Sequence, residues 1–446
     1  MKFIFSILVF FSGALIMASE KPNLVVIVAD DLGWADVGYH GGDIPTPHLD
    51  LMAEDGVQLD RFYVAPMCTP TRVGFLTGRY WSRFGNTNPS NNQVIPFETE
   101  TIASFLKSHG YKTSIFGKWH LGSKLEWGPD KFGFDESYGS LAGGVGPWLH
   151  KYKKGTFSQT WHRNGKFIFE SGHVTDLITK NAIQELDKLQ NAGHPFFMYI
   201  PFTAVHNPLQ EPDIWRLRGE SLKNDRPEYS ACVMHMDHCI GLILEKLKQR
   251  TKTHNRENII LFFSDNGGTI NPTEGDDSRY PGVYAHNVLL GRNAPLRGRK
   301  TQLFEGGIRV PAILHSPDIF GPAIVESPIH VVDIFPTLTA LLGIPSNKTV
   351  TSDGNDRSDL LNGTYPDQKM DHNPFYWLGV NRNSRAVLRW PWKWIQLKKN
   401  PKEEYLFNLS IDGGESTNLI SENMKIRDSL FEIARKQSRL DDTLMP

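Results

Sequence analysis

The chain has 446 residues, which is long enough for one large α/β domain with a smaller appendage and too short for three ordinary domains. Hydrophobic residues make up 39% of it and charged residues 22%, the composition of an ordinary globular protein. A formal net charge of -1 excludes the basic field on which nucleic-acid binding depends, so any site for an anion must be built from a few placed cations.

The N-terminus has the pattern of a secretory signal peptide. One cation, Lys2, precedes an apolar run over residues 3–17, and the small residues Ala18 and Ser19 follow it. A membrane anchor is the alternative, but the run is short for a full span, and no later segment is predicted to cross a membrane. We therefore predict a signal peptide over residues 1–18 and an exported product, periplasmic or secreted, or lysosomal or secreted in a eukaryote.

Apolar strands that end in polar clusters recur along the chain and indicate the fold class. Residues 24–29 form a run rich in β-branched side chains that ends in Asp30 and Asp31. Three further runs end in the same way, over residues 113–116, 195–200 and 259–264. Helical stretches, such as 99–109 and 174–190, separate them. This alternation predicts an α/β fold with a doubly wound sheet, in which ligands bind at the carboxyl ends of the strands.

The chain changes character near residue 345. Residues 331–342 have the spacing of a last helix of the main domain, and the sequence then becomes polar and rich in Gly, Asn and Asp. Short strands and a final helix are predicted further on, over residues 384–390, 392–397, 405–407 and 424–440. We predict a main domain over residues 19–344 and a smaller α+β subdomain, with a small antiparallel sheet and the terminal helix, over residues 345–446.

Only three cysteines occur, and one of them opens the most specific motif. Cys232 and Cys239 lie on one face of a predicted helix, where core residues are a better explanation than a disulfide. Cys68 is left without a partner and begins the segment CTPTR, which LTGR follows at residues 76–79. Pro70 suits the first turn of a helix, so Cys68 is expected just before a helix N-terminus, where backbone amides favour an anion.

The segment at residues 68–72 resembles the Cys-x-Pro-x-Arg signature of type I sulfatases, whose cysteine is oxidised to formylglycine. Thr71 departs from the Ser or Ala more common there. The resemblance implies an alkaline-phosphatase-like fold with a large mixed sheet, and it makes residues 19–344 the catalytic domain. It implies that one hydroxyl of the hydrated aldehyde at position 68 attacks sulfur, that the other drives release of sulfate, and that Arg72 orients the pair. A buried structural thiol is the alternative for Cys68.

Oxygen ligands at two strand ends indicate a metal site. Asp30 and Asp31 follow one strand, and Asp265 and Asn266 follow another. Carboxylates held together repel each other without a cation, and oxygen donors suit Ca²⁺ or Mg²⁺ better than zinc. In sulfatases the matching positions bind one divalent cation, usually calcium, together with the formylglycine, which adds Cys68 to the set. The alternative for Asp30 and Asp31 is that they cap a loop.

Three further segments resemble motifs of the same family. They are GKWHLG at residues 117–122, AVHNPL at residues 204–209, and PLRGRK with EGGIRVP at residues 295–300 and 305–311. The resemblance implies that Lys118 and Lys300 bind the sulfate. It also implies that His120 removes a proton from the second hydroxyl and that His206 protonates the leaving alcohol. Taken singly, each has a plainer explanation, such as a solvated lysine or a satisfied core or loop histidine.

The segments together predict a sulfuric ester hydrolase that acts on sulfated carbohydrates with galactose or N-acetylgalactosamine-type units. Their amino-acid sequences most resemble those of the arylsulfatase B and N-acetylgalactosamine-4-sulfatase branch. Expected partners are the sulfated carbohydrate and the enzyme that makes formylglycine, with no nucleic acid. Aromatic side chains at residues 148–161 are candidates for stacking on sugar rings, or for the core. The alternatives are a phosphatase or phosphonate monoester hydrolase of the same superfold, and a non-catalytic glycan-binding protein.

Overall fold

The computed structural model describes residues 20–249, 256–271, 279–282, 289–344, 352–361, 373–397 and 403–445. The predicted signal peptide lies outside these ranges and stays a prediction. Within them, no helix combines the length and the apolar character that crossing a membrane requires.

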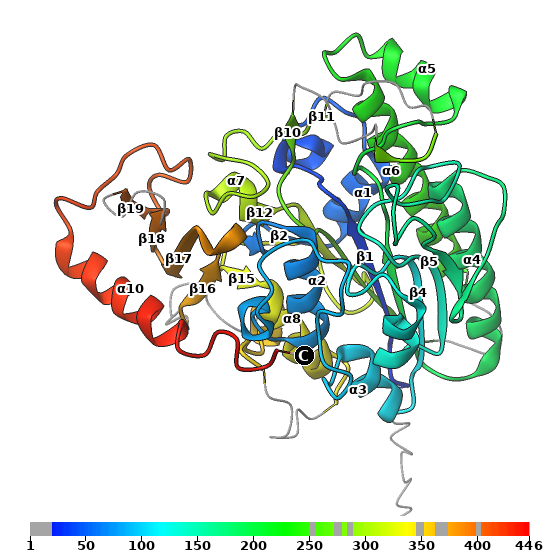
Figure 1. The fold of residues 1–446 in the computed structure, drawn as a ribbon, viewed down its shortest axis with the longest axis horizontal. Helices are drawn as coiled ribbons and strands as arrows, with labels where there is room; N and C mark the ends of the chain where they lie inside the picture. Colours follow the sequence, from blue (N-terminus) through cyan, green and yellow to red (C-terminus); the bar gives the residue numbers. More distant parts are fainter. Residues whose placement is uncertain are drawn as a thin grey trace, which may run out of the picture.

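A ten-stranded sheet forms the centre of the molecule (Figure 1). In sheet order its strands are β14 (Ala323–Val325), β2 (Val57–Leu59), β13 (Ala312–His315), β9 (Asn258–Ser264), β1 (Asn23–Ala29), β8 (Phe196–Pro201), β4 (Lys112–Lys118), β5 (Glu136–Ser140), β6 (Trp161–Arg163) and β7 (Lys166–Phe167). The strands from β9 to β5 run parallel, and antiparallel neighbours adjoin them on both sides. The sheet is therefore mixed, as predicted.

Helices cover both faces of this sheet. Alternate side chains of β1 enter two different cores, because successive residues of a strand point to opposite faces. One core includes α2 (Cys68–Thr77), α3 (Ile102–Ser108) and α8 (Ile334–Leu341), and the other includes α1 (Pro47–Asp55), α4 (Val174–Ala192) and α6 (Pro227–Lys248). Every residue of β1 is buried, which explains its unbroken apolar run. The doubly wound α/β prediction is confirmed.

The longer predicted elements all occur. Predicted strands 24–29, 113–116, 195–200 and 259–264 are β1, β4, β8 and β9, and predicted helices 99–109 and 174–190 are α3 and α4. The predicted helix 331–342 begins with a 3-10 turn over Val331–Asp333 and continues as α8. Cys232 and Cys239 are buried on α6 and form no disulfide, as predicted.

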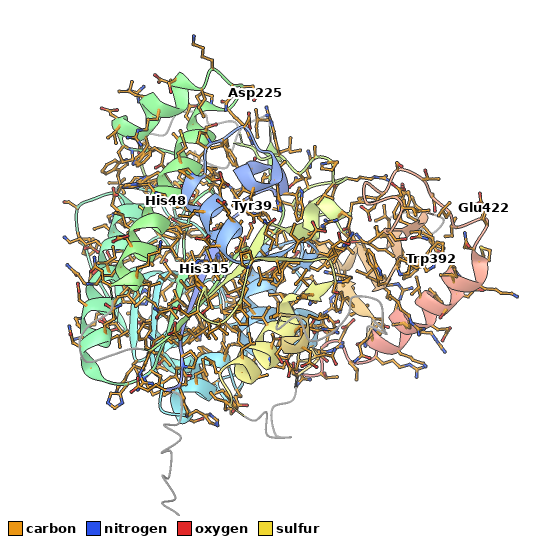
Figure 2. The ribbon with its side chains drawn as sticks, turned by 180° about the vertical axis from the view of Figure 1, so that it is seen from behind. Tyr39, His48, Asp225, His315, Trp392 and Glu422 are labelled. Carbon is orange, nitrogen blue, oxygen red and sulfur yellow. The ribbon has the colours of Figure 1, made fainter. Side chains whose placement is uncertain are left out.

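A four-stranded antiparallel sheet and a helix form the C-terminal part. The strands are β16 (Phe375–Leu378), β17 (Ser384–Arg389), β18 (Trp392–Leu397) and β19 (Glu404–Asn408), and α10 (Met424–Gln437) packs on β17 and β18. Figure 2 shows Trp392 and Glu422 in this part, well apart from His48 and His315 in the main one. Strand β16 was not predicted. The proposed boundary at residues 344 and 345 stays a prediction, since residues 345–351 are not described.

Candidate active site

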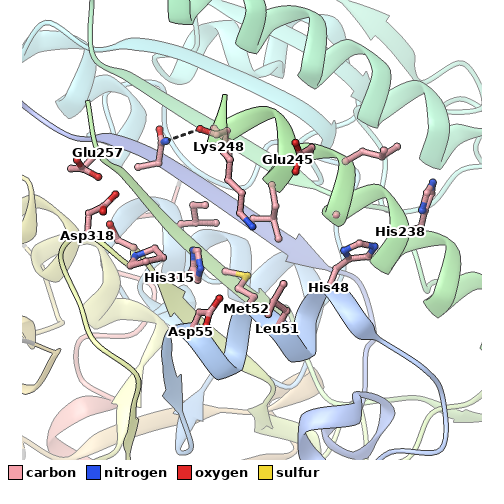
Figure 3. Close-up of a pocket in the computed structure, with 18 residues that line it drawn as sticks. His48, Leu51, Met52, Asp55, His238, Glu245, Lys248, Glu257, His315 and Asp318 are labelled. Atoms are coloured by element: carbon pink, nitrogen blue, oxygen red, sulfur yellow. Dashed lines mark hydrogen bonds between the residues drawn. The ribbon is translucent and has the colours of Figure 1, made fainter. Parts of the chain in front are cut away.

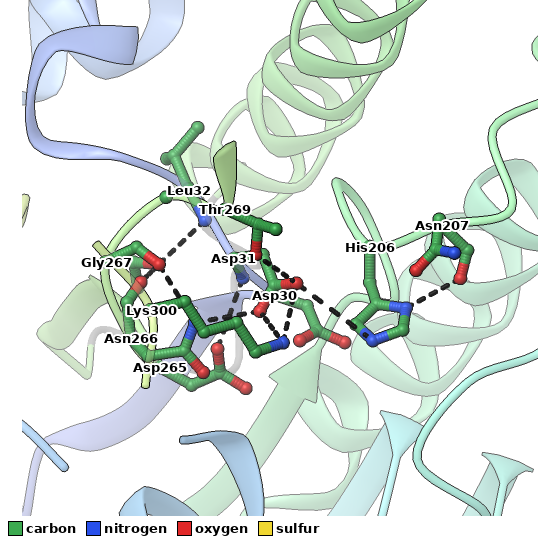
Figure 4. A network of polar contacts seen from close by, with 12 residues as sticks. Asp30, Asp31, Leu32, His206, Asn207, Asp265, Asn266, Gly267, Thr269 and Lys300 are labelled. Atoms are coloured by element: carbon green, nitrogen blue, oxygen red, sulfur yellow. Dashed lines mark hydrogen bonds and ion pairs between the residues drawn. The ribbon is translucent and has the colours of Figure 1, made fainter. Parts of the chain in front are cut away.

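The acidic residues predicted to bind a metal meet at the carboxyl ends of β1 and β9. The two strands are parallel neighbours with Ala29 opposite Ser264, so the residues that follow them lie side by side. The backbone N–H of Asp31 donates to Asp265 Oδ1 at 3.2 Å, and Asn266 Nδ2 donates to Asp31 Oδ1 at 2.8 Å (Figure 4). Asp30, Asp31, Asp265 and Asn266 are all buried.

Cys68 joins this group from the N-terminus of α2. It is the first residue of the helix, one position further in than expected, and Pro70 lies in the first turn as predicted. The Sγ atom and one carboxylate oxygen each of Asp30 and Asp265 lie within 4.8 Å of one another. Burial raises the pKa of the Cys68 thiol, so the unmodified side chain is protonated at neutral pH.

Arg72 reaches the same centre from the next turn of α2. Its guanidinium donates to Asp265 Oδ2 and to the carbonyl oxygen of Lys118, both at 2.8 Å. Arg72 is 1% exposed and Asp265 is fully buried, so this is an ion pair removed from water. Arg72 therefore joins α2, β4 and the end of β9, and it orients the carboxylate of Asp265 next to Cys68.

The two lysines expected to bind sulfate lie on the carboxylates. Lys118 Nζ donates to Asp30 Oδ2 at 2.5 Å, and Lys300 Nζ donates to Asp31 Oδ1 at 2.5 Å and to Oδ2 at 2.7 Å. Burial acts to raise the pKa of Asp31, but Lys300 and the other neighbours that favour the carboxylate together outweigh it, and the pKa is lowered. Burial raises the pKa of Asp265 to about 6, and Asp30 beside it acts in the same direction.

Both predicted catalytic histidines border this cluster. His206 Nε2 lies 4.0 Å from Asp31 Oδ2, and His206 Nδ1 lies 2.6 Å from the carbonyl oxygen of Asn207. Burial lowers the pKa of His206 to about 3, although Asp31 acts to raise it. His120 is buried and its pKa is also lowered by burial, with Lys118 and Arg72 reinforcing the effect. Both rings are therefore neutral at neutral pH.

The backbone is strained where it places these groups. Asp31 and His120 have φ values of 69° and 60°, a left-handed conformation that costs free energy in residues other than glycine. Gly143, which the sequence analysis did not single out, lies against His120. A Cβ at position 143 would lie 2.1 Å from His120 Nε2, so only glycine fits there. The adjacent pair Gly143-Gly144 was the available sequence signal.

Two atoms of the cluster show that its residues fit a hard cation. Asp30 Oδ1 and Asn266 Oδ1 are buried acceptors without a hydrogen-bond partner among the described residues. Buried oxygen atoms are nearly always paired, so these two have room for a ligand that is positively charged. Three carboxylates and an amide oxygen are the donors that Ca²⁺ prefers, and the thiol of Cys68 is the one soft atom among them.

The aromatic residues expected near the site divide into two kinds. Trp161 is 2% exposed and belongs to the core, whereas Trp148 is 41% exposed and donates from Nε1 to the carbonyl oxygen of Gln210 at 3.0 Å. Gln210 follows His206 on the same loop, so Trp148 is the aromatic candidate near the site. Trp161 is not available to a sugar.

A separate cavity of about 540 Å³ opens at the opposite end of the sheet. Asn258, the first residue of β9, lines it, while Ser264 at the other end of β9 leads into the acidic cluster. Its walls include apolar side chains of α1 and α6 and the rings of His48, His238 and His315 (Figure 3). It contains none of the predicted catalytic or metal-binding residues.

Comparisons with known proteins identify the family of this chain. The family profile described as Sulfatase matches residues 22–344, and the chain belongs to this family of hydrolases. Arylsulfatase J of Mus musculus is 34% identical over 76% of this chain and 55% of its own length. N-acetylgalactosamine-6-sulfatase of Mus musculus is 32% identical over 81% of this chain and 70% of its own length. These relatives support the family and do not single out the arylsulfatase B branch.

Solved structures extend the similarity to the whole described chain. The crystal structure of Ps i-CgsB in complex with k-i-k-neocarrahexaose is 30% identical, with a TM-score of 0.84, over 96% of this chain and 95% of that one. The crystal structure of PsFucS1 sulfatase from Pseudoalteromonas sp. is 20% identical with a TM-score of 0.77, which shows the fold alone. The predicted fold class is thus confirmed by these structures.

Proposed function

We propose that this chain hydrolyses sulfate monoesters of carbohydrates, R–O–SO₃⁻ plus water to R–OH and hydrogen sulfate, after Cys68 is converted to formylglycine. The observation that carries the proposal is the position of Cys68. It lies at a helix N-terminus, within 4.8 Å of two carboxylates from two different strand ends. A buried thiol with only a structural role has no need of such neighbours, because apolar contacts suit it better.

The acidic cluster is proposed to hold one Ca²⁺ through Asp30, Asp31, Asp265, Asn266 and residue 68. A formylglycine hydrate at position 68 would supply one hydroxyl as the nucleophile and a second whose deprotonation releases sulfate, and a bound calcium ion would supply positive charge to the site. Arg72 orients Asp265 through one hydrogen bond of 2.8 Å, and a second of the same length to the carbonyl oxygen of Lys118 fixes the guanidinium. It is therefore a positioning residue in this proposal.

Lys118 and Lys300 are proposed to bind the sulfate group. Each ammonium has three N–H donors, and the structure shows them engaged with Asp30 and Asp31. Donors that are not used on the carboxylates remain for sulfate oxygens. Fixed cations in a buried site stabilise the negative charge that builds up in the transition state more strongly than they do in water.

His206 and His120 are proposed to act on protons at the two ends of the reaction. A sulfate anion beside His206 raises its pKa, since an adjacent negative charge favours the imidazolium. His206 can then give its proton to the leaving oxygen. His120 is kept neutral by burial and by the cations around it, which suits a base, and its Nδ1 has no partner among the described residues.

A sulfated carbohydrate with galactose or N-acetylgalactosamine-type units is the proposed substrate. Two findings support it: the relative named N-acetylgalactosamine-6-sulfatase and the similar structure of Ps i-CgsB with its bound oligosaccharide. Trp148 offers an exposed ring near the loop of His206. Export through the predicted signal peptide is part of the proposal, because polysaccharides of this kind lie outside the cell.

The test has two arms on protein produced together with a formylglycine-generating enzyme. Mass spectrometry of the peptide with residue 68 is expected to show loss of the thiol and gain of an aldehyde. A screen over 4-O- and 6-O-sulfated galactose and N-acetylgalactosamine oligosaccharides is expected to show sulfate release with at least one. An intact thiol in active enzyme would contradict the mechanism. Faster turnover of matched phosphate esters would favour a phosphatase, and activity on aryl sulfates alone would contradict the carbohydrate substrate.

A further inference from the structure

A second cluster of metal-ligating side chains lies outside the catalytic centre. It is built from the start of α4, from one face of α6, and from the loop that follows His206. Its members are His173, Asp176, Glu211, Cys232, His235 and Cys239. The two cysteines that the proposed chemistry does not use are both among them, so the cluster gathers nitrogen, oxygen and sulfur donors at one place.

Three of these side chains converge on one point. His235 and Cys239 are one helical turn apart on α6, so their side chains lie on the same face. Asp176 approaches them from α4, and its Oδ1 lies 3.0 Å from His235 Nε2. One donor atom from each of Asp176, His235 and Cys239 lies within 4.8 Å of the other two. Donor atoms at such separations can share one ion, because zinc binds nitrogen, oxygen and sulfur at about 2.0 to 2.3 Å.

The surroundings of His235 direct one ring nitrogen to that point. Glu211 Oε2 lies 2.5 Å from His235 Nδ1 and accepts its proton in a hydrogen bond. With the proton on Nδ1, the lone pair of neutral His235 is on Nε2, the nitrogen that lies 3.0 Å from Asp176 Oδ1. Trp215 stacks on the ring with centroids 5.2 Å apart and an interplanar angle of 14°. A carboxylate behind a histidine is the usual support of a metal-binding imidazole.

His173 is excluded as a ligand by its own hydrogen bond. The backbone N–H of Thr175 donates to His173 Nδ1 at 3.3 Å, which puts the proton of the neutral ring on Nε2. That N–H lies 3.6 Å from Glu211 Oε1, too far for a hydrogen bond, and it offers no lone pair to a metal ion. The ligand set is therefore Asp176, His235 and Cys239, with Glu211 behind it.

We propose that Asp176, His235 and Cys239 form a binding site for Zn²⁺, with water as the fourth ligand. The mixed sulfur, nitrogen and oxygen set suits zinc and not calcium, which prefers oxygen alone. The ion can enter from solvent, because the side chain of Asp176 is 58% exposed while His235 is 1% exposed. Binding releases the thiol proton of Cys239 and, where His235 is charged, one imidazolium proton.

The competing arrangement contains no metal. In it, His235 is an imidazolium held between Glu211 and Asp176, and Cys239 is a buried thiol beside it. The two arrangements differ in the role of Cys239, which is a thiolate ligand in one and a bystander in the other. Glu211 and His206 belong to the same loop, so a zinc ion here would join that loop to α4 and α6.

The test measures metal content and not sulfate release, so it is independent of the proposed function. Calcium-saturated protein is treated with Zn²⁺, dialysed, and assayed for zinc by mass spectrometry in the wild type and in Cys239→Ala, Asp176→Ala and Cys232→Ala variants. Cys232→Ala is the matched control, because it removes a buried thiol of the cluster that is not a ligand. The wild type and Cys232→Ala are expected to retain one zinc ion per chain more than the other two.

Cobalt gives an independent measure of the sulfur ligand. Co²⁺ in place of zinc is expected to produce a sulfur-to-cobalt charge-transfer band that Cys239→Ala weakens and Cys232→Ala leaves unchanged. Glu211→Gln is expected to lower zinc affinity by about 10- to 100-fold. Equal zinc content in Cys239→Ala and Cys232→Ala, or no zinc retained by the wild type, would overturn the site. Loss of zinc in Asp176→Ala cannot be explained by misfolding, because the side chain that this substitution removes is exposed.

Discussion

In the described part of the chain, two buried clusters of carboxylates and lysines differ in how completely they are paired. The C-terminal charge cluster consists of Glu305, Lys393 and Glu415, and its side chains are fully buried. Lys393 Nζ lies 2.8 Å from one oxygen of each glutamate. The second oxygen of Glu305 accepts from Tyr63 OH at 2.9 Å, and that of Glu415 accepts from the backbone N–H of Glu305 at 2.7 Å.

The catalytic centre lacks that completeness. Asp30 Oδ1 and Asn266 Oδ1 have no hydrogen-bond partner among the described residues. Glu415 Oε1 also makes no hydrogen bond there, but it forms an ion pair with Lys393 Nζ at 2.8 Å. The C-terminal charge cluster joins β18 to α7 (Glu305–Ile308) and to β3 (Phe62–Tyr63), which is the middle strand of a separate three-stranded sheet. It therefore connects the four-stranded sheet to this three-stranded sheet and requires no ligand. Left-handed backbone occurs in both clusters, at Asp31 and at Glu415, which has a φ of 54°. Neither buried charge nor strained backbone therefore identifies a functional site, whereas buried oxygen atoms without a charged or hydrogen-bonding partner do.

The largest expected effect is on chemistry in the catalytic centre. Cys68→Ala removes the atom that becomes the nucleophile, so sulfate ester hydrolysis is expected to fall by about 10⁴-fold or more. Initial rates on the best substrate of the screen measure it, with Cys232→Ala as a control for loss of a buried thiol. Activity within about tenfold of the wild type in Cys68→Ala would place the nucleophile elsewhere.

The next largest effect is expected on the free energy of unfolding, through the C-terminal charge cluster. Lys393→Met removes the cation that two buried carboxylates share, and it is expected to lower the free energy of unfolding by about 3 to 5 kcal/mol. Urea unfolding at neutral pH measures this change. The folded fraction is expected to keep its kcat, whereas Lys118→Met is expected to lose it. A Lys393→Met protein with native stability would show that the cluster does not hold the two sheets together.

Calcium is expected to stabilise the protein through the catalytic centre alone. At a calcium concentration 100 times its Kd, the free energy of unfolding is expected to rise by about 2.7 kcal/mol, because the ion binds the folded state. Asp265→Asn is expected to lose this response and Glu415→Gln to keep it. Paired urea titrations with and without calcium measure this response. An equal response in both variants would remove Asp265 from the ligand set.

The smallest effect concerns pH and the C-terminal charge cluster. Burial raises the pKa of Glu415 to about 7. The charge of Lys393 opposes this shift, and the charge of Glu305 reinforces it. Between the ordinary value of 4.5 and about 7, the folded state keeps a proton that the unfolded state has released, so stability falls as the pH rises through this window. The expected loss is about 1 to 3 kcal/mol, and Glu415→Gln is expected to abolish it. Unfolding curves at about pH 5 and about pH 8 measure it, and an unchanged slope in the variant would assign the pH dependence to other groups.

Much of the fold follows from local patterns. Strand β1 was predictable because all of its residues after Asn23 are apolar, the pattern that is typical of a strand buried on both faces. The strand ends were predictable as a site because parallel strands place their carboxyl ends at one edge. Short strands such as β2, β13 and β16 escaped prediction, since three or four residues carry no periodicity and depend on their neighbours for hydrogen bonds.

The sequence by itself determined which residue types the centre contains, because the motif around Cys68 and the acidic strand ends are continuous segments whose chemistry can be read directly. Only the tertiary structure decided which of them touch. Lys118 contacts Asp30 across 88 residues of chain, and Lys300 contacts Asp31 across 269. Such pairs depend on the packing of whole strands and helices, which local propensity does not predict. The same holds for Asp176, Glu211 and His235, which come from three separate elements and meet only when α4 and α6 pack together.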